Sequence, residues 1–135
     1  MVAACVVDNS VVVSWMYPAQ ATPYTERLLE TTADSTLHTA FIWPAEFANA
    51  ASVMVRRAIL TEELGVEMIR MADALSLTVD RTPADLGSLY RISRRHGLSV
   101  YDAAYLELAV RLRLPLATRD LALEQAARSL ELFLA

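Results

Sequence analysis

An uninterrupted apolar run at the start of the chain ends abruptly at an acidic residue. Residues 2–7 read Val-Ala-Ala-Cys-Val-Val, and Asp8 follows them. A continuous run of this kind is typical of a strand that is buried on both faces of a parallel sheet. Further candidate strands stand at residues 37–42, 77–80, 114–118 and 130–134. The sequence therefore predicts a mainly parallel sheet of about five strands.

Helix start signals occupy the segments between the candidate strands. A proline or a capping residue close to an acidic residue predicts a helix N-terminus. Such signals stand at Thr22-Pro23, at Pro44 with Glu46, at Thr61-Glu62-Glu63, at Thr82-Pro83-Ala84-Asp85 and at Ser99-Val100-Tyr101-Asp102. The last two have the form of capping boxes, and Gly97 is expected to end the helix between them. Strands that alternate with helices in this way predict a single α/β domain over residues 1–135.

Composition excludes several classes of site. The chain has no Lys among its 12 basic residues, which excludes a Walker-type phosphate loop and Schiff-base chemistry. One Cys and two His do not favour a zinc site, and a single thiol forms no disulfide framework. Asp8 interrupts the first apolar run and no basic residue precedes Arg27, so neither a signal peptide nor a membrane span is expected. We therefore expect a cytoplasmic protein whose chemistry depends on its carboxylates.

Acidic residues follow the predicted strands. Asp8 and Asp120 each come just after an apolar strand, and Glu46 lies in the first turn of the helix that follows the second strand. Because ligands bind beyond the carboxyl ends of parallel strands, we expect these three side chains to converge there. Asp102 begins a later helix, and the order of elements leaves open at which end of the sheet that helix starts.

Each acid also has a structural interpretation. Asp120 could be a helix N-cap, Asp102 part of a capping box, and Glu46 a residue favoured by the helix dipole. Asp8 fits no helix pattern, although an Asx-turn with Ser10 could account for it. Gathered in one place, the four carboxylates would repel one another, and their pKa values would rise unless a cation neutralised them. An all-oxygen site of this type favours Mg²⁺ or Mn²⁺.

The net charge of −4 is compatible with a polyanionic substrate. Once the four acids are set aside, the remaining acidic residues equal the 12 arginines in number. The net negative charge therefore belongs to the candidate site and not to the surface as a whole. It does not exclude a nucleic acid as the substrate.

Four segments, taken in order, resemble a known family. They are Val6-Val7-Asp8-Asn9-Ser10-Val11, Trp43-Pro44-Ala45-Glu46-Phe47-Ala48-Asn49, Gly97-Leu98-Ser99-Val100-Tyr101-Asp102-Ala103-Ala104-Tyr105-Leu106-Glu107-Leu108-Ala109 and Leu116-Ala117-Thr118-Arg119-Asp120-Leu121. Together they resemble PIN-domain proteins of the bacterial VapC toxin type over essentially the whole chain. The resemblance implies a three-layer α/β/α sandwich (PIN-like) in which the four acids meet in one pocket.

The resemblance also implies a reaction, because family members are metal-dependent ribonucleases. The residues at the family's catalytic, metal-binding positions are Asp8, Glu46, Asp102 and Asp120. Asp8 and Asp102 are expected to be the principal ligands of one or two Mg²⁺ or Mn²⁺ ions, and Asp120 a shared or second ligand. Glu46 is expected to be a ligand or the base that positions a water. The water would hydrolyse an RNA phosphodiester and leave a 5′-phosphate and a 3′-hydroxyl.

Polar and basic residues near these positions have expected supporting roles. Residues that match the polar positions beside the acids, where they would orient a carboxylate or a water, are Asn9, Ser10 and Thr118. Candidate RNA contacts at the end of a predicted helix are Arg91, Arg94 and Arg95. Basic residues at that place also complement the helix dipole, so a structural interpretation exists for them.

A surplus of apolar residues indicates partner chains. The hydrophobic fraction of 55% is high for 135 residues, so part of that surface is expected to be covered. Residues 44–58 and 61–75 are rich in Ala, Val, Met and Ile, which suits a homodimer or a groove for a partner peptide. The resemblance implies both, since VapC-like proteins commonly dimerise and are held inactive by a cognate antitoxin (VapB-like) that covers the site.

Other functions also fit parts of the pattern. An aspartyl-phosphate phosphatase would need a second acid two residues after Asp8, where Ser10 stands. A PIN-domain nuclease of RNA maturation or decay outside a toxin system is the nearest alternative, and a non-catalytic metal-binding domain is another. The leading hypothesis is the toxin endoribonuclease.

Overall fold

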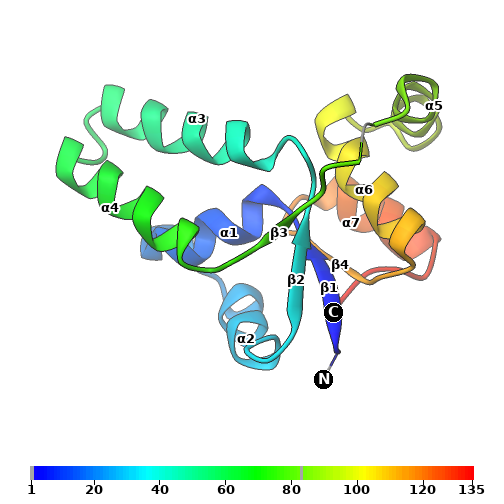
Figure 1. Ribbon diagram of the computed structural model, residues 1–135, viewed down its shortest axis with the longest axis horizontal. Helices are drawn as coiled ribbons and strands as arrows, with labels where there is room; N and C mark the ends of the chain where they lie inside the picture. Colours follow the sequence, from blue (N-terminus) through cyan, green and yellow to red (C-terminus); the bar gives the residue numbers. More distant parts are fainter. Residues whose placement is uncertain (1, 83) are drawn as a thin grey trace.

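The computed structural model describes residues 2–82 and 84–135, which form three layers (Figure 1). The central layer is a parallel sheet with the strand order β3-β2-β1-β4. Its strands in the described residues are β1 (Ala4–Val7), β2 (Thr36–Thr39), β3 (Thr78–Val79) and β4 (Leu116–Ala117). The predicted α/β/α sandwich with a parallel sheet is confirmed, with four strands where about five were expected.

Helices cover both faces of the sheet. Those of the described residues are α1 (Asn9–Met16), a short 3₁₀ helix (Pro18–Gln20), α2 (Pro23–Thr31), α3 (Trp43–Arg56), α4 (Glu62–Asp73), α5 (Leu86–His96), α6 (Val100–Leu112) and α7 (Leu121–Ser129). In Figure 1, α1 to α4 pack together on one side of the sheet and α5 to α7 on the other. The three layers thus divide the chain into an N-terminal and a C-terminal helical group.

Local capping signals account for most helix boundaries. Thr22, Thr61 and Ser99 each accept a hydrogen bond from the backbone N–H three residues later, as the sequence predicts. Gly97 follows α5 with φ 65°, in the left-handed region that glycine adopts at helix ends. α3 begins at Trp43, so its proline stands in the first turn, as predicted.

The predicted capping box at residues 82–85 is wrong as the start of a helix. α5 begins at Leu86, because Asp85 accepts a hydrogen bond from Ser88 N at 2.9 Å and so occupies the N-cap position. Pro83, the second residue of the predicted box, lies outside the described residues.

The predicted strand at residues 130–134 is also wrong. Within the described residues, this segment pairs with the sheet through an isolated bridge between Leu116 and Phe133. Two backbone hydrogen bonds form this bridge, from Leu116 N to Leu132 O (2.7 Å) and from Leu134 N to Leu116 O (2.9 Å). Side chains add to it: the Phe133 ring stacks on Tyr24 with 5.8 Å between centroids, and the Tyr24 hydroxyl donates to Leu134 O at 2.6 Å. The segment therefore anchors α2 to the sheet edge without extending the sheet.

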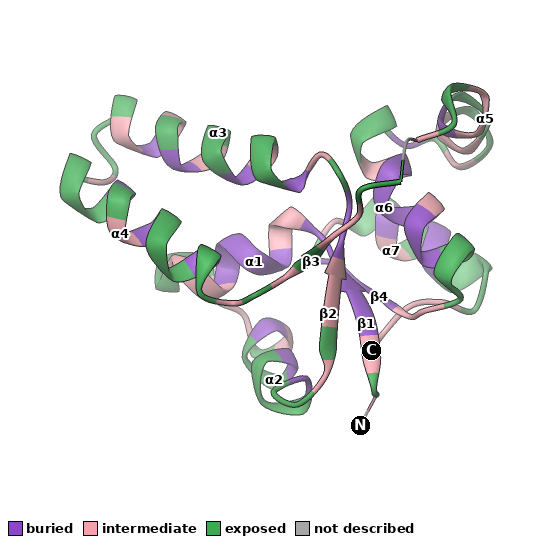
Figure 2. Ribbon diagram, viewed as in Figure 1, coloured by how far each residue is buried: buried purple, intermediate pink, exposed green. Residues whose placement is uncertain are grey.

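The core lies on both sides of β1. Cys5, Val6 and Val7 have no exposed surface, and neither do Leu106 and Ala109 of α6 (Figure 2). Burial raises the pKa of the Cys5 thiol to about 11, which makes it an inert core residue. Among the described helices, none is both long enough and apolar enough to span a membrane.

β1 stands where the strand order changes direction. The chain runs from β1 through β2 to β3 at one edge of the sheet, and then crosses back to β4 on the other side of β1. The backbone N–H of Asp8 still donates to Ala117 O at 3.3 Å, which holds the ends of β1 and β4 together. In parallel sheets, ligands bind beyond the carboxyl ends of the strands at this switch point.

Candidate active site

Asp8 is a buried acid at the switch point. It directly follows β1, and only 3% of its surface is exposed. Its Oδ1 accepts hydrogen bonds from the Ser10 hydroxyl (2.6 Å) and Val11 N (3.1 Å). Its Oδ2 accepts a hydrogen bond from the Thr118 hydroxyl at 2.5 Å. Three donors therefore hold the carboxylate in one orientation.

The bond to Val11 makes Asp8 the N-cap of α1, a role that the sequence analysis does not assign to it. α1 reads Asn-Ser-Val-Val-Val-Ser-Trp-Met, and β-branched residues favour strands over helices. Val11, Val12 and Val13 are all buried, and α1 packs against α2, α3 and α4, so tertiary packing forms this helix in spite of its low propensity. The interaction with Ser10 that the sequence suggests is present, through the Ser10 hydroxyl.

Ser10 and Thr118 connect Asp8 to the segment after β4. The Ser10 hydroxyl oxygen accepts a hydrogen bond from Arg119 N (2.9 Å), and that of Thr118 accepts one from Asp120 N (3.0 Å). Each hydroxyl thus accepts from a backbone N–H and donates its proton to Asp8. This is the geometry that a carboxylate-orienting role requires.

Glu46 and Asp102 face the same cavity as Asp8. The cavity has a volume of about 450 Å³, and we call it the acidic cleft. Glu46 stands in the first turn of α3 and Asp102 in the first turn of α6. The Tyr105 hydroxyl donates to Glu46 Oε1 at 2.5 Å and so fixes that side chain. The N-terminal turns of two helices therefore carry acids to the carboxyl end of the sheet.

Asp120 stands beside the acidic cleft and does not line it. Its Oδ2 accepts a hydrogen bond from Leu123 N at 2.8 Å, which makes it the N-cap of α7. The structural interpretation considered for this residue is therefore correct. Its charge is nevertheless close enough to Asp102 to raise the pKa of that carboxyl.

Burial and repulsion between like charges raise the pKa values of Asp8 and Asp102. Burial raises the pKa of Asp8 to about 6, although its three hydrogen bonds act in the opposite direction, and the charge of Asp102 adds to the rise. The pKa of Asp102 is raised by burial, then by Asp120 and Glu46. A cation in the cleft would reverse both effects.

We expect the metal-free protein to lose stability as the pH rises from about 4 to above 6. The folded pKa of Asp8, about 6, exceeds its ordinary value of 3.8, so stability present at low pH is lost as the carboxyl ionises. The difference between these two pKa values corresponds to about 3 kcal/mol. Urea unfolding in a chelating buffer across this range measures the loss. Asp8→Asn is the control, and an equal pH dependence in both proteins would contradict the expectation.

The donor atoms of the cleft suit a hard cation. Asp8, Glu46 and Asp102 offer only oxygen atoms, the donors that Mg²⁺ and Mn²⁺ prefer. Asn9 also lines the cleft, and its Oδ1 is buried without a hydrogen-bond partner. Within residues 2–82 and 84–135, no three His, Cys, Asp or Glu side chains converge closely enough to form a finished metal site. The residues therefore fit a divalent cation in chemistry and charge.

Sequence reasoning did not assign a role to three polar residues of the cleft. Tyr105 lies three residues after Asp102 on α6, and Asn49 lies three residues after Glu46 on α3. Side chains three apart on a helix share one face, so this spacing could have identified both. Gln20 belongs to the short 3₁₀ helix, for which the sequence carries no corresponding signal.

The arginines proposed as RNA contacts lie outside the cleft lining. Arg94 and Arg95 stand in the last turn of α5, one short segment before the first turn of α6 that carries Asp102. Arg91 donates to the Ser88 hydroxyl at 3.2 Å. Their role in RNA binding stays a prediction.

A known domain family matches nearly the whole chain. The model of the PIN domain covers residues 5–129. The chain belongs to the PIN-domain family. The matched range contains each of the predicted acidic positions, Asp8, Glu46, Asp102 and Asp120.

This PIN domain has VapC-type relatives. It is 34% identical over 120 residues to Ribonuclease VapC1 of Mycobacterium tuberculosis, in strains CDC 1551 / Oshkosh and ATCC 25618 / H37Rv, and the alignment covers 86% of this chain and 85% of the relative. The predicted resemblance to VapC-type PIN domains is confirmed. The crystal structure of PAE2754 from Pyrobaculum aerophilum shares the fold, with a TM-score of 0.71 and 20% identity over 91% of this chain and 78% of that chain.

Proposed function

We propose that this PIN domain is a metal-dependent endoribonuclease that acts as the toxin of a toxin–antitoxin pair. The acidic cleft carries the proposal, because the buried carboxylate of Asp8 shares it with Glu46 and Asp102 at the switch point of the sheet. Carboxylates with raised pKa values in one cavity are typical of functional sites, and of cation sites in particular. The name of the relative, Ribonuclease VapC1, supports RNA as the substrate.

Asp8 and Asp102 are the proposed principal ligands of one or two Mg²⁺ or Mn²⁺ ions, and Asp120 is a proposed shared or second ligand. Glu46 is proposed as either a further ligand or the base that positions the water. A bound ion would supply positive charge to the phosphodiester and lower the pKa of the attacking water. Ser10 and Thr118 orient Asp8, since their hydroxyls donate to its two oxygens.

The contact with Tyr105 favours the second of these two roles for Glu46, that of the general base. The Tyr105 hydroxyl occupies its Oε1, which leaves Oε2 for a water in the cleft. A carboxylate held in this way can accept a proton from the attacking water without first reorganising.

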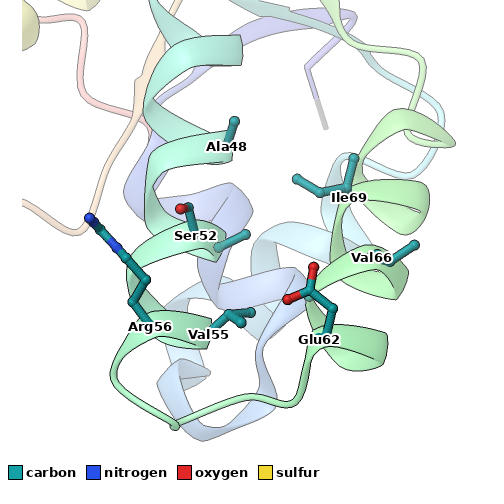
Figure 3. A pocket seen from close by; sticks show the side chains of 9 residues that line it. Ala48, Ser52, Val55, Arg56, Glu62, Val66 and Ile69 are labelled. Carbon is teal, nitrogen blue, oxygen red and sulfur yellow. The ribbon is translucent and has the colours of Figure 1, made fainter.

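An apolar groove between α3 and α4 supports the partners in this proposal. A cavity of about 350 Å³ lies between these helices, and the side chains of Val55 and Ile69 point into it (Figure 3). Val66 is 63% exposed, and exposed apolar surface of this kind is typical of protein contacts. We therefore include in the proposal a cognate antitoxin (VapB-like) that blocks the cleft, and a homodimer.

Cleavage of RNA tests the proposed activity. The purified chain, freed of any partner, is incubated with total cellular RNA and Mn²⁺ or Mg²⁺. We expect discrete fragments with 5′-phosphate ends, and none in the presence of a chelator. Intact RNA, together with calorimetry that detects bound metal, would contradict the ribonuclease and favour a non-catalytic metal-binding domain.

Growth arrest tests the toxin role separately. Expression of the chain in a bacterial host is expected to stop growth, and expression of Asp8→Asn is not. Cleavage in vitro without growth arrest would favour a PIN-domain nuclease of RNA maturation or decay.

A further inference from the structure

A second pocket adjoins the acidic cleft at Thr118. It has a volume of about 440 Å³, which is within the range of ligand-binding pockets. α2, the segment after β4, α7 and the segment around Phe133 enclose it. Its lining includes Arg27, Arg119, Arg128, Tyr24 and Phe133, and we call it the arginine pocket.

Planar groups are stacked in the arginine pocket. The rings of Tyr24 and Phe133 stack with 5.8 Å between centroids and an interplanar angle of 25°. The guanidinium of Arg128 lies 4.4 Å from the centroid of the Phe133 ring, and that of Arg27 lies 5.7 Å from that of Tyr24. Surfaces of aromatic rings and guanidinium planes are typical of sites that bind unpaired bases.

The charge of the arginine pocket is opposite to that of the cleft. Three arginine side chains line it against one glutamate, Glu124. Glu124 accepts a hydrogen bond from Arg128 Nε at 2.8 Å, so its charge is already compensated. Among the described residues, Arg27 forms no ion pair. An anion is therefore the ligand that this pocket favours.

The arginine pocket and the acidic cleft share a wall. The Thr118 hydroxyl donates to Asp8, which lines the cleft, while Thr118 itself lines the pocket. Arg119 lines the pocket too, and its Nη1 donates to Gln20 Oε1 at 3.4 Å, a side chain of the cleft. A polymer bound across the cleft could therefore continue into the pocket.

We propose that the arginine pocket is a second RNA-binding subsite, which holds a nucleotide of the substrate strand near the phosphate that is cut. Arg27, Arg119 and Arg128 face the phosphate of that nucleotide, and the stacked rings and guanidinium groups face its base. The inference rests on the proposed ribonuclease function. It explains how a domain of net charge −4 could hold a polyanion close to an acidic cleft.

Binding of a short, random-sequence, fluorescein-labelled single-stranded RNA tests the subsite. Fluorescence anisotropy is measured at a series of KCl concentrations in a chelating buffer, with all chains carrying Asp8→Asn to prevent cleavage. Arg27→Ala with Arg128→Ala is expected to weaken binding about tenfold or more. The slope of log K against log salt is expected to become shallower by about 0.7, because the pocket holds one phosphate and each phosphate neutralised on a single strand contributes about 0.7.

The control pair is Arg56→Ala with Arg57→Ala, which removes the same charge at the far end of α3. We expect it to leave the salt slope unchanged. Both residues of the test pair are exposed, so the variants are expected to fold, and circular dichroism checks this. Arg128→Lys keeps the charge, so we expect its slope of log K against log salt to be that of the chain with Arg128. Equal losses in the test and control pairs, or a lysine that restores nothing, would overturn the proposal.

Steady-state cleavage by chains that retain Asp8 adds a second readout. In Arg27→Ala with Arg128→Ala we expect KM to rise about tenfold and kcat to change less than about twofold, because the pocket binds away from the reacting atoms. If the wild type cleaves RNA and the double variant has the same KM and kcat, the subsite is overturned and the proposed ribonuclease activity is not. Absence of both binding and cleavage in the wild type would overturn both.

An acidic protein segment is the competing occupant. A polyglutamate peptide that binds the wild type and not the double variant, with RNA affinity unchanged, would overturn the proposal and assign the pocket to a protein partner.

Discussion

Replacing Asp8 or Asp102 by Asn is expected to reduce RNA cleavage by more than about 100-fold while the fold is retained. Both side chains line the acidic cleft, and an amide oxygen is a weaker, uncharged ligand for a divalent cation. Asn is as good an N-cap as Asp, so α1 keeps its cap in Asp8→Asn. Cleavage of total RNA with Mn²⁺ measures the loss, and circular dichroism checks the fold.

Asp34→Asn is the matched control for these two variants. Asp34 is an exposed acid between α2 and β2, and it does not line the cleft. Its replacement removes the same charge and is expected to leave cleavage unchanged. Wild-type activity in Asp8→Asn or in Asp102→Asn would contradict the assignment of the cleft.

Leu108→Ala is expected to lower the free energy of unfolding by about 2 to 5 kcal/mol. Leu108 lies on α6 and is 1% exposed, in the helix that packs directly on β1 and β4. The loss is a large share of the stability of a domain of this size, roughly 5 to 15 kcal/mol. Urea unfolding measures it. Val110→Ala, at a 47% exposed position of the same helix, is expected to cost less than about 1 kcal/mol. Similar losses at both positions would contradict the packing of α6.

The sequence predicts the layered fold because most local signals agree with the tertiary structure. Thr22, Thr61 and Ser99 cap helices with their own side chains, and an apolar run such as residues 4–7 has few alternatives to a buried strand. Local signals mislead in segments whose secondary structure depends on contacts with residues far away in the sequence. The valines of α1 would suit a strand, and their burial in the tertiary structure stabilises the helix instead.

The candidate site could be predicted less completely than the fold. Asp8 could be placed because it follows β1, and Glu46 because it lies in the first turn of the helix after β2. Parallel strands end at the same edge of the sheet, so both residues are predicted to lie there. Asp102 could not be placed in this way, because two helices separate β3 from β4 and the position of α6 depends on how they pack. Its position followed from the family resemblance alone, and the structure shows it lining the same cleft.

The bond between Asp8 and Thr118 joins residues that are 110 positions apart. β1 is the first strand to be synthesised, yet it pairs with β4, the last strand of the described chain. During synthesis, Asp8 is therefore translated long before Thr118, whose hydroxyl orients its carboxylate. The acidic cleft is therefore incomplete until β4 and Thr118 have been translated.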